Sequence, residues 1–73
     1  MKTGTLFYNE GNDRMDVCFS DGSTHGGLHC GECLDVKIDG EYMPTRIEMG
    51  TEWYLVETVL RGVGALAGLK VRM

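Results

Sequence analysis

The strongest constraint on the fold of this chain is a strict alternation of apolar and charged residues over Leu34–Asp39. Successive side chains of a β-strand point to opposite faces, so the three apolar residues of this segment share one face. Asp39-Gly40 ends the segment, and this dipeptide suits the positive φ angles of a two-residue type I′ turn. The pattern predicts a hairpin in which Leu34–Asp39 pairs with the residues after Gly40.

The turn also predicts the register of the returning strand. With Asp39 and Gly40 at its centre, Val36 lies opposite Met43, and alternate residues of the returning strand face the core. The expected core-facing residues are Met43, Thr45, Ile47 and Met49, and the expected outward residues are Tyr42, Pro44, Arg46 and Glu48. Because proline has no N–H to donate to a neighbouring strand, we expect an edge or a bulge at Pro44.

A second reversal is predicted at residues 50–52, which read Gly-Thr-Glu. A three-residue loop there sets Met49 opposite Trp53 and turns the tryptophan toward the core, whereas a two-residue loop would turn it outward. Burial of a large aromatic side chain favours the longer loop. We therefore expect a buried Trp53 at the start of a strand over Trp53–Val59.

Three more alternating segments complete an all-β pattern. Thr5–Asn9 and Met15–Ser20 flank a turn-rich stretch, and Leu69–Met73 closes the chain. In the segment Met15–Ser20, the residues expected to face the core are Met15, Val17 and Phe19. The connecting segments are expected to be a glycine-rich loop over residues 21–29 and a loop or one helical turn over residues 60–68. We predict a single domain over residues 1–73, a small barrel or roll of about six short antiparallel strands, similar in size to an SH3 domain.

The composition favours a small cytoplasmic protein. The chain has 73 residues, of which 42% are hydrophobic, and its net charge of −4 argues against a generic nucleic-acid-binding protein. No apolar run approaches the roughly 20 residues of a membrane span, and Glu10 follows the N-terminus before any signal-peptide core, so we expect no membrane association. The three cysteines do not fit a secreted disulfide framework, and they favour reduced thiols in the cytoplasm.

The spacing Cys30-Gly-Glu-Cys33 raises a metal and a redox hypothesis. Two close thiolates can share a zinc ion, with Cys18 and either His25 or His29 as further ligands, but structural zinc sites usually contain two such close pairs. A thioredoxin-type pair gains its reactivity at a helix N-terminus, whereas Cys33 leads into a predicted strand. The sequence favours inert thiols, with a small zinc-stabilised domain as an alternative.

No catalytic motif is recognisable in the chain. It contains no Walker loop, no Gly-x-Ser-x-Gly elbow and no His-Glu-x-x-His pair, and both histidines lie in the glycine-rich loop. Residues 62–68 look like a dinucleotide-binding loop, but only five residues follow Gly68, too few for the required βαβ unit. We expect neither an enzyme nor a bound cofactor.

Charge is distributed unevenly along the chain. Residues 1–60 hold four basic and eleven acidic side chains, whereas residues 61–73 hold three basic and no acidic ones. One interpretation pairs these cations with acidic neighbours in the sheet. The alternative is a nucleic-acid accessory protein that combines basic residues with tyrosine stacking surfaces. The residues of this alternative are Arg46, Arg61, Lys70 and Arg72, with Tyr8, Tyr42 or Tyr54.

The leading functional hypothesis is a noncatalytic module that binds another protein. Leu69–Met73 is predicted to be a terminal strand with a free edge, where an acidic segment of a partner would add as a further strand. If the terminal strand is not the interaction surface, we expect the surface on the glycine-rich segment His25–Cys33, because functional residues concentrate on loops. The candidate binding residues are Lys70, Arg72, Arg46 and His29.

Four segments of the chain resemble a family of short bacterial proteins. These segments are Gly26–Cys33 (GGLHCGEC), Tyr42–Met49 (YMPTRIEM), Trp53–Val56 (WYLV) and Gly68–Arg72 (GLKVR). The family is an uncharacterised domain of unknown function from Gram-positive anaerobes, often found on conjugative or other mobile elements. The resemblance covers nearly the whole chain and implies a small stand-alone cytoplasmic protein with an accessory role in such an element. It implies no activity, cofactor or catalytic residue.

Overall fold

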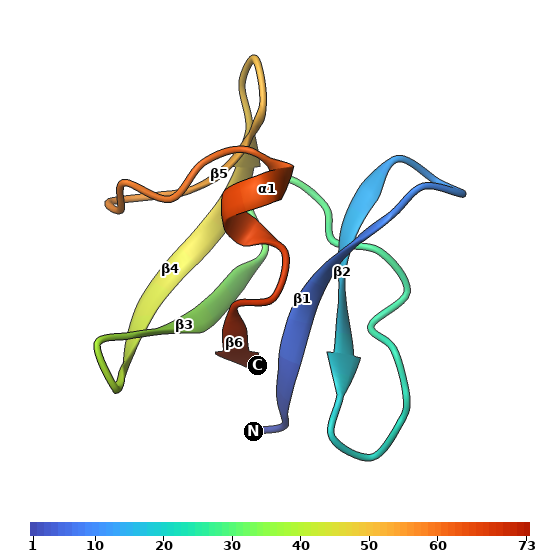
Figure 1. Cartoon of the computed structure of the whole chain (residues 1–73), viewed down its shortest axis with the longest axis vertical. Helices are drawn as coiled ribbons and strands as arrows, with labels where there is room; N and C mark the ends of the chain where they lie inside the picture. The colour runs from blue at the N-terminus through green and yellow to red at the C-terminus, as the bar shows by residue number, and fades with distance from the viewer.

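The computed structural model describes all residues from Met1 to Met73. In chain order the elements are β1 (Thr3–Asn9), β2 (Arg14–Phe19), β3 (Cys33–Ile38), β4 (Glu41–Met49), β5 (Trp53–Leu55), α1 (Val63–Leu66) and β6 (Lys70–Arg72). The strands form one antiparallel sheet in the spatial order β2-β1-β6-β3-β4-β5 (Figure 1). The all-β prediction is confirmed. The sheet does not close on itself, so the terms barrel and roll describe it only loosely.

The β3–β4 hairpin has the predicted turn and register. Asp39 and Gly40 have φ angles of 52° and 84°, and positive values at both positions are what a type I′ turn requires. Val36 pairs with Met43, as expected from a two-residue loop. Local turn chemistry therefore determines how this half of the sheet is aligned.

β5 begins as predicted but ends early. Trp53 lies across a three-residue loop from its partner in β4, and only 5% of its surface is exposed, which confirms the longer loop. The strand stops at Leu55, so the predicted extension to Val59 is wrong. Glu57 has a φ angle of 61°, and the Thr58 N–H donates to the Leu55 carbonyl, so the backbone turns instead of extending.

β6 joins the two hairpins at the centre of the sheet. Val71 pairs with Gly4 of β1 on one side and with Val36 of β3 on the other. Figure 1 shows this short red strand between the blue and green strands. The prediction that the terminal strand is a free edge is therefore wrong, because both of its sides already face a paired neighbour. A partner strand cannot add there.

The core lies between the hairpins and is completed by α1 and by the loop that follows β2. The buried hydrophobic residues are Leu6, Met15, Val17, Phe19, Leu28, Leu34, Val36, Ile47, Trp53, Leu55, Leu66 and Val71. The predicted inward face of β2 is confirmed by this set. α1 is a single helical turn, one of the two alternatives expected for residues 60–68, and Leu66 anchors it in the core. No helix of the structure has the length and apolar character needed to span a membrane.

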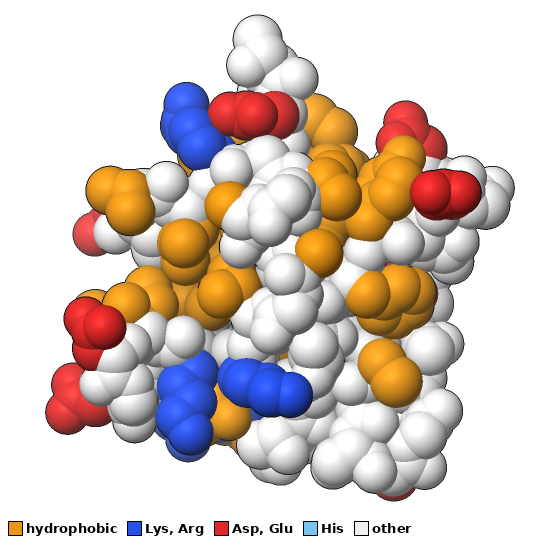
Figure 2. All heavy atoms as spheres, in the orientation of Figure 1, with side chains coloured by type: hydrophobic (Ala, Val, Ile, Leu, Met, Phe, Trp, Pro, Cys, Tyr) orange, Lys and Arg blue, Asp and Glu red, His pale blue; other side chains and the backbone are white.

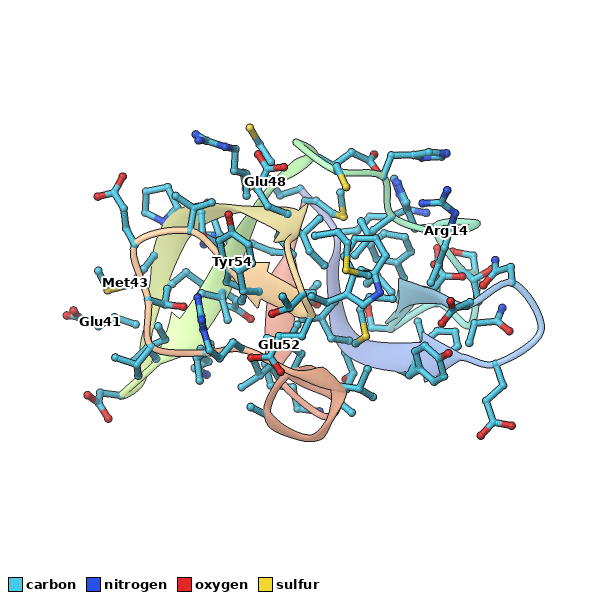
Figure 3. The ribbon with its side chains drawn as sticks, turned by 90° about the horizontal axis from the view of Figure 1, so that it is seen from above. Arg14, Glu41, Met43, Glu48, Glu52 and Tyr54 are labelled. Carbon is cyan, nitrogen blue, oxygen red and sulfur yellow. The ribbon has the colours of Figure 1, made fainter.

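β4 buries less of its predicted core face than expected. Ile47 is fully buried, but Met43 and Met49 expose 47% and 43% of their surface. The strand is nine residues long and extends beyond the core layer at both ends, so the prediction that both methionines join the core is wrong. Figure 3 shows Met43 near the turn of the β3–β4 hairpin, at the opposite end of the molecule from Arg14.

The loop between β2 and β3 covers the outer edge of β2. The His25 N–H donates to the Val17 carbonyl and the Leu28 N–H to the Met15 carbonyl, so the loop runs beside β2 as an irregular extra strand. Asp16 is buried beneath this loop, and its carboxylate accepts hydrogen bonds from two backbone N–H groups. At this end of the sheet the chain therefore protects its own edge.

Candidate functional site

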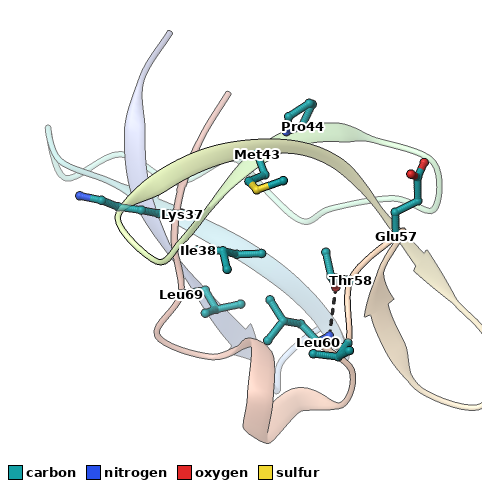
Figure 4. Close-up of a pocket in the computed structure, with 9 residues that line it drawn as sticks. Lys37, Ile38, Met43, Pro44, Glu57, Thr58, Leu60 and Leu69 are labelled. Carbon is teal, nitrogen blue, oxygen red and sulfur yellow. Dashed lines mark hydrogen bonds between the residues drawn. The ribbon is translucent and has the colours of Figure 1, made fainter.

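An apolar groove lies beside the turn half of the β3–β4 hairpin. Its volume is about 620 Å³, and its walls come from the hairpin, from the chain after β5 and from the residue before β6 (Figure 4). Figure 2 shows hydrophobic side chains gathered on this part of the surface, over β4 and beside α1. The lining residues are Lys37, Ile38, Met43, Pro44, Glu57, Thr58, Val59, Leu60 and Leu69.

The groove exists because β5 is short. β5 pairs only with Ile47–Met49, so the first half of β4 has a strand neighbour on one side alone. Pro44 lies in this half, and the edge predicted at the proline is confirmed. The chain that would have extended β5 turns away at Glu57 and forms the opposite wall of the groove.

Hydrogen bonds hold this opposite wall in place. The Thr45 hydroxyl donates to the Val56 carbonyl at 2.8 Å. The Thr58 hydroxyl donates to the Leu55 carbonyl at 2.8 Å and accepts from the Leu60 N–H at 3.0 Å, the bond drawn in Figure 4. The wall is thus fixed by side-chain contacts to the backbone, and the groove is formed before any ligand arrives.

The interior of the groove is apolar and its rim is charged. In Figure 4, Ile38, Met43 and Leu69 point into the space between the walls, whereas Lys37 points away from it. Val59 at the tip of the wall is 93% exposed, which is a high value for a branched apolar residue. This arrangement can bury an apolar side chain of a ligand, while the charged residues of the rim, Lys37 and Glu57, contact polar groups of the ligand around it.

The basic residues predicted from the sequence lie in separate places. Lys70 and Arg72 occupy alternate positions of β6 and share its outward face, since Val71 between them is buried. Arg46 pairs with Glu48 on β4 at 3.0 Å, and Arg61 lies over a tyrosine ring of β5 at 5.3 Å. None of the four lines the groove.

The predicted metal ligands do not converge on one point. All three cysteine side chains are exposed. Cys18 lies on β2, Cys30 lies on the loop between β2 and β3, and Cys33 begins β3. His25 and His29 both approach Glu32 instead. No three His, Cys, Asp or Glu side chains are grouped so that they could hold a metal ion, so the zinc hypothesis gains no support from the geometry.

Glu32 connects two parts of the loop that covers β2, because its carboxylate contacts both histidines. Its carboxylate lies 2.8 Å from His25 Nε2 and accepts a hydrogen bond of 2.6 Å from the His29 N–H. Partial burial of the carboxyl favours its neutral form, but the hydrogen bonds from His29 and His25 outweigh this and hold the pKa of Glu32 below its ordinary value. His29, a predicted binding residue, therefore contributes its backbone to this contact, while its side chain is 70% exposed.

Sequence reasoning alone does not find the groove. A strand over Trp53–Val59 would have occupied the free side of β4 and left no space there. Two signals in the sequence do point to it, namely Pro44 within a strand and the apolar pair Val59-Leu60 shortly before a glycine-rich segment. Both are weak, because each is also compatible with an ordinary edge strand.

Comparison with known proteins gives the chain a family but no named activity. Residues 4–73 match the model of a domain of unknown function. The chain belongs to this family, DUF5348. It is 51% identical to a protein from the Gram-positive anaerobe Ruminococcus gnavus, whose crystal structure superposes with a TM-score of 0.85 over 99% of this chain and 100% of that one. No curated protein matches the chain. The resemblance inferred from four segments is thus confirmed for the family, and a protein similar to this chain occurs in a Gram-positive anaerobe.

Proposed function

We propose that this DUF5348 protein is a noncatalytic module that binds another protein through the groove beside β4. The observation that supports this proposal is a preformed groove of about 620 Å³ with an apolar interior, bordered by Met43 at 47% and Val59 at 93% exposure. Exposed apolar surface of this kind, rimmed by charge, is typical of protein interaction sites. The occupant we propose is an apolar side chain on a short segment of the partner.

Burial of a side chain is the favoured mode of binding because strand addition has little room, and the free side of the first half of β4 carries Pro44, which has no N–H to donate. β6 is central, the edge of β2 is covered by its own loop, and β5 is flanked by the returning chain. On that side the Gly62 N–H donates to the Trp53 carbonyl, and Arg61 forms an isolated bridge with Tyr54. The partner therefore gains its affinity from apolar contact in the groove rather than from backbone pairing.

The setting we propose is the cytoplasm of a Gram-positive anaerobe, where the module serves as an accessory factor of a mobile element. Three free cysteines with exposed side chains support a reducing compartment. The mobile-element role depends on the resemblance to proteins carried by such elements. A partner encoded by the same element is the first candidate.

The experiment that tests the groove compares two methionines of β4. Both are similarly exposed, but Met43 lines the groove and Met49 does not. A partner is isolated from the bacterium on the immobilised protein, purified, and titrated calorimetrically against wild type, Met43→Glu and Met49→Glu. We expect Met43→Glu to raise Kd at least tenfold, because a carboxylate in the groove must lose water without gaining a partner. Met49→Glu should stay within about twofold of wild type.

Circular dichroism and thermal melting show whether both variants remain folded. If Met43→Glu binds the purified partner as tightly as wild type, the groove is not the binding site. The same conclusion follows if the two variants lose equal affinity, because a general effect of the added charge then explains the loss.

A further inference from the structure

A second hollow lies on the outward face of the sheet and is lined by no acidic residue. Its volume is about 480 Å³, and it crosses β1, β6, β3 and β4 and the end of β2. The lining residues are Thr3, Gly4, Thr5, Cys18, Phe19, Ser20, Lys37, Tyr42 and Lys70. The chain as a whole carries a net charge of −4, whereas the lining of this hollow has two lysines and no acidic residue.

The two lysines of the hollow keep their charge available. Neither forms a salt bridge, and Lys70 Nζ donates to the Thr5 hydroxyl at 3.1 Å. The acidic residue of β3, Asp35, is paired with Arg72 at 2.9 Å. At the other end of the hollow, Asp21 is likewise paired with Lys2.

Tyr42 supplies an aromatic surface among these cations. The Arg72 guanidinium lies 4.4 Å from the centre of its ring and Lys37 Nζ lies 5.7 Å from it. A second stack of the same kind, Arg61 on Tyr54 at 5.3 Å, lies outside the hollow. The molecule therefore contains two arginine–tyrosine stacks, of which only one adjoins an acid-free surface.

From this juxtaposition we infer that the hollow binds single-stranded nucleic acid. Lys37 and Lys70 contact phosphates, the hydroxyls of the hollow donate to phosphate oxygens, and Tyr42 stacks on an unpaired base. An acidic peptide would use the lysines but has no flat unpaired base to stack on the tyrosine ring, which is why the observations favour nucleic acid. The residue set differs from the one that the sequence indicated, since Arg46 and Arg61 are not part of it.

The test measures the anisotropy of a fluorescent oligothymidylate of about 15 nucleotides, a length in the range that small β domains cover. The variant Lys37→Gln/Lys70→Gln is compared with Arg46→Gln/Arg61→Gln, which removes the same charge outside the hollow. We expect the first to raise Kd at least tenfold and the second to stay within about threefold. The slope of log K against log salt should also fall by about 1.4 in the first variant, because two phosphate contacts are lost.

A second comparison tests the stacking surface. Tyr42→Leu should weaken binding about tenfold, whereas Tyr54→Leu, which removes the other stacked tyrosine, should leave Kd unchanged. Met43→Glu should also bind the oligonucleotide normally, so a failure of the groove proposal and a failure of this one are distinguishable. Circular dichroism confirms that each variant is folded.

Three results would overturn the inference. One is no salt-dependent binding of the oligonucleotide by wild type. Another is equal binding by the Lys37→Gln/Lys70→Gln variant and its control. The third is displacement of the oligonucleotide by polyglutamate at the same charge concentration, together with an unchanged Kd for Tyr42→Leu, which would identify an acidic peptide as the ligand.

Discussion

The β1–β2 and β3–β4 hairpins share an alternating pattern but differ in what covers them. On β2 the whole predicted core face is buried, and even Asp16 on its opposite face lies under the loop. On β4 only Ile47 is fully buried, while Met43 and Met49 remain in contact with water. Alternation therefore determines which side chains share a face, but burial requires a second layer from elsewhere in the chain.

The two hairpins differ less in what they give to the core than in the sites they border. Both supply buried residues from each of their strands, and the β1–β2 hairpin lines the hollow but not the groove. The less covered hairpin borders both candidate sites, because Met43 lines the groove and its neighbour Tyr42 lines the hollow on the other face. The ends of β4 escape the core, and this leaves their side chains free for a ligand.

The largest expected effect compares one methionine from each hairpin. Met15→Ala on β2 removes a side chain with no exposed surface, so we expect the free energy of unfolding to fall by about 2–5 kcal/mol. Met43→Ala on β4 removes a side chain that is 47% exposed and should change it by no more than about 0.5 kcal/mol. Urea denaturation of the two variants measures both values. Similar losses would show that β4 is as well covered as β2.

The next effect concerns the turns of the two hairpins. Gly40 has a φ angle of 84°, where a β-branched residue is strained, so Gly40→Val should cost about 1–3 kcal/mol. Gly11, in the turn of the other hairpin, has no positive φ, and a side chain there would meet only the tip of Asn9. Gly11→Val should therefore cost less than about 1 kcal/mol. An unchanged melting temperature for Gly40→Val would contradict the type I′ turn.

The parts of the fold that the sequence predicts well depend on local chemistry. Asp39-Gly40 carries its own turn preference, and burial of Trp53 selects one of two registers. The position of β6 depends instead on pairing between residues far apart, since Val71 meets Gly4 and Val36. Alternation in Leu69–Met73 predicts a strand, but it does not predict which strands lie beside it.

The candidate sites are less predictable for the same reason. The groove depends on a backbone turn at Glu57, a residue type with no preference for its φ angle of 61°. Lys37 and Tyr42 of the hollow are partners in the β3–β4 hairpin, but Lys70 joins them only because β6 lies beside β3. Basic residues can be counted from a sequence, whereas their grouping on one face follows from strand order.

A smaller effect tests the loop that covers β2. Ionised Glu32 accepts the hydrogen bonds of this loop, and its pKa in the folded protein is below the ordinary value of 4.5. Its contribution is therefore complete above about pH 4.5 and is lost as the pH falls through the lower, folded-state pKa. We expect Glu32→Ala to cost about 1 kcal/mol at pH 7, by urea denaturation, and the difference from wild type to shrink at pH 3.

The control for this prediction is Glu10→Ala. Glu10 is exposed in the turn of the β1–β2 hairpin and makes no side-chain hydrogen bond or salt bridge. Its removal should alter stability by less than about 0.5 kcal/mol at either pH. A Glu32→Ala difference that stays constant between pH 7 and pH 3 would mean that the carboxylate charge does not hold the loop.

The smallest effect lies in α1, which packs beside β1 and helps to close the core between the hairpins. Gly64 is helical, and a side chain there would meet no atom within 4 Å, so Gly64→Ala should stabilise the protein by about 0.4–1 kcal/mol by restricting the unfolded chain. Gly62 has a φ angle of 85°, and a side chain there would lie 3.0 Å from Glu52, which Figure 3 shows beside this turn. Gly62→Ala should therefore destabilise the protein, and thermal melting of the two variants should give shifts of opposite sign. Shifts of the same sign would mean that the backbone at the start of α1 differs from the one described. The packing of α1 against the core would then differ as well.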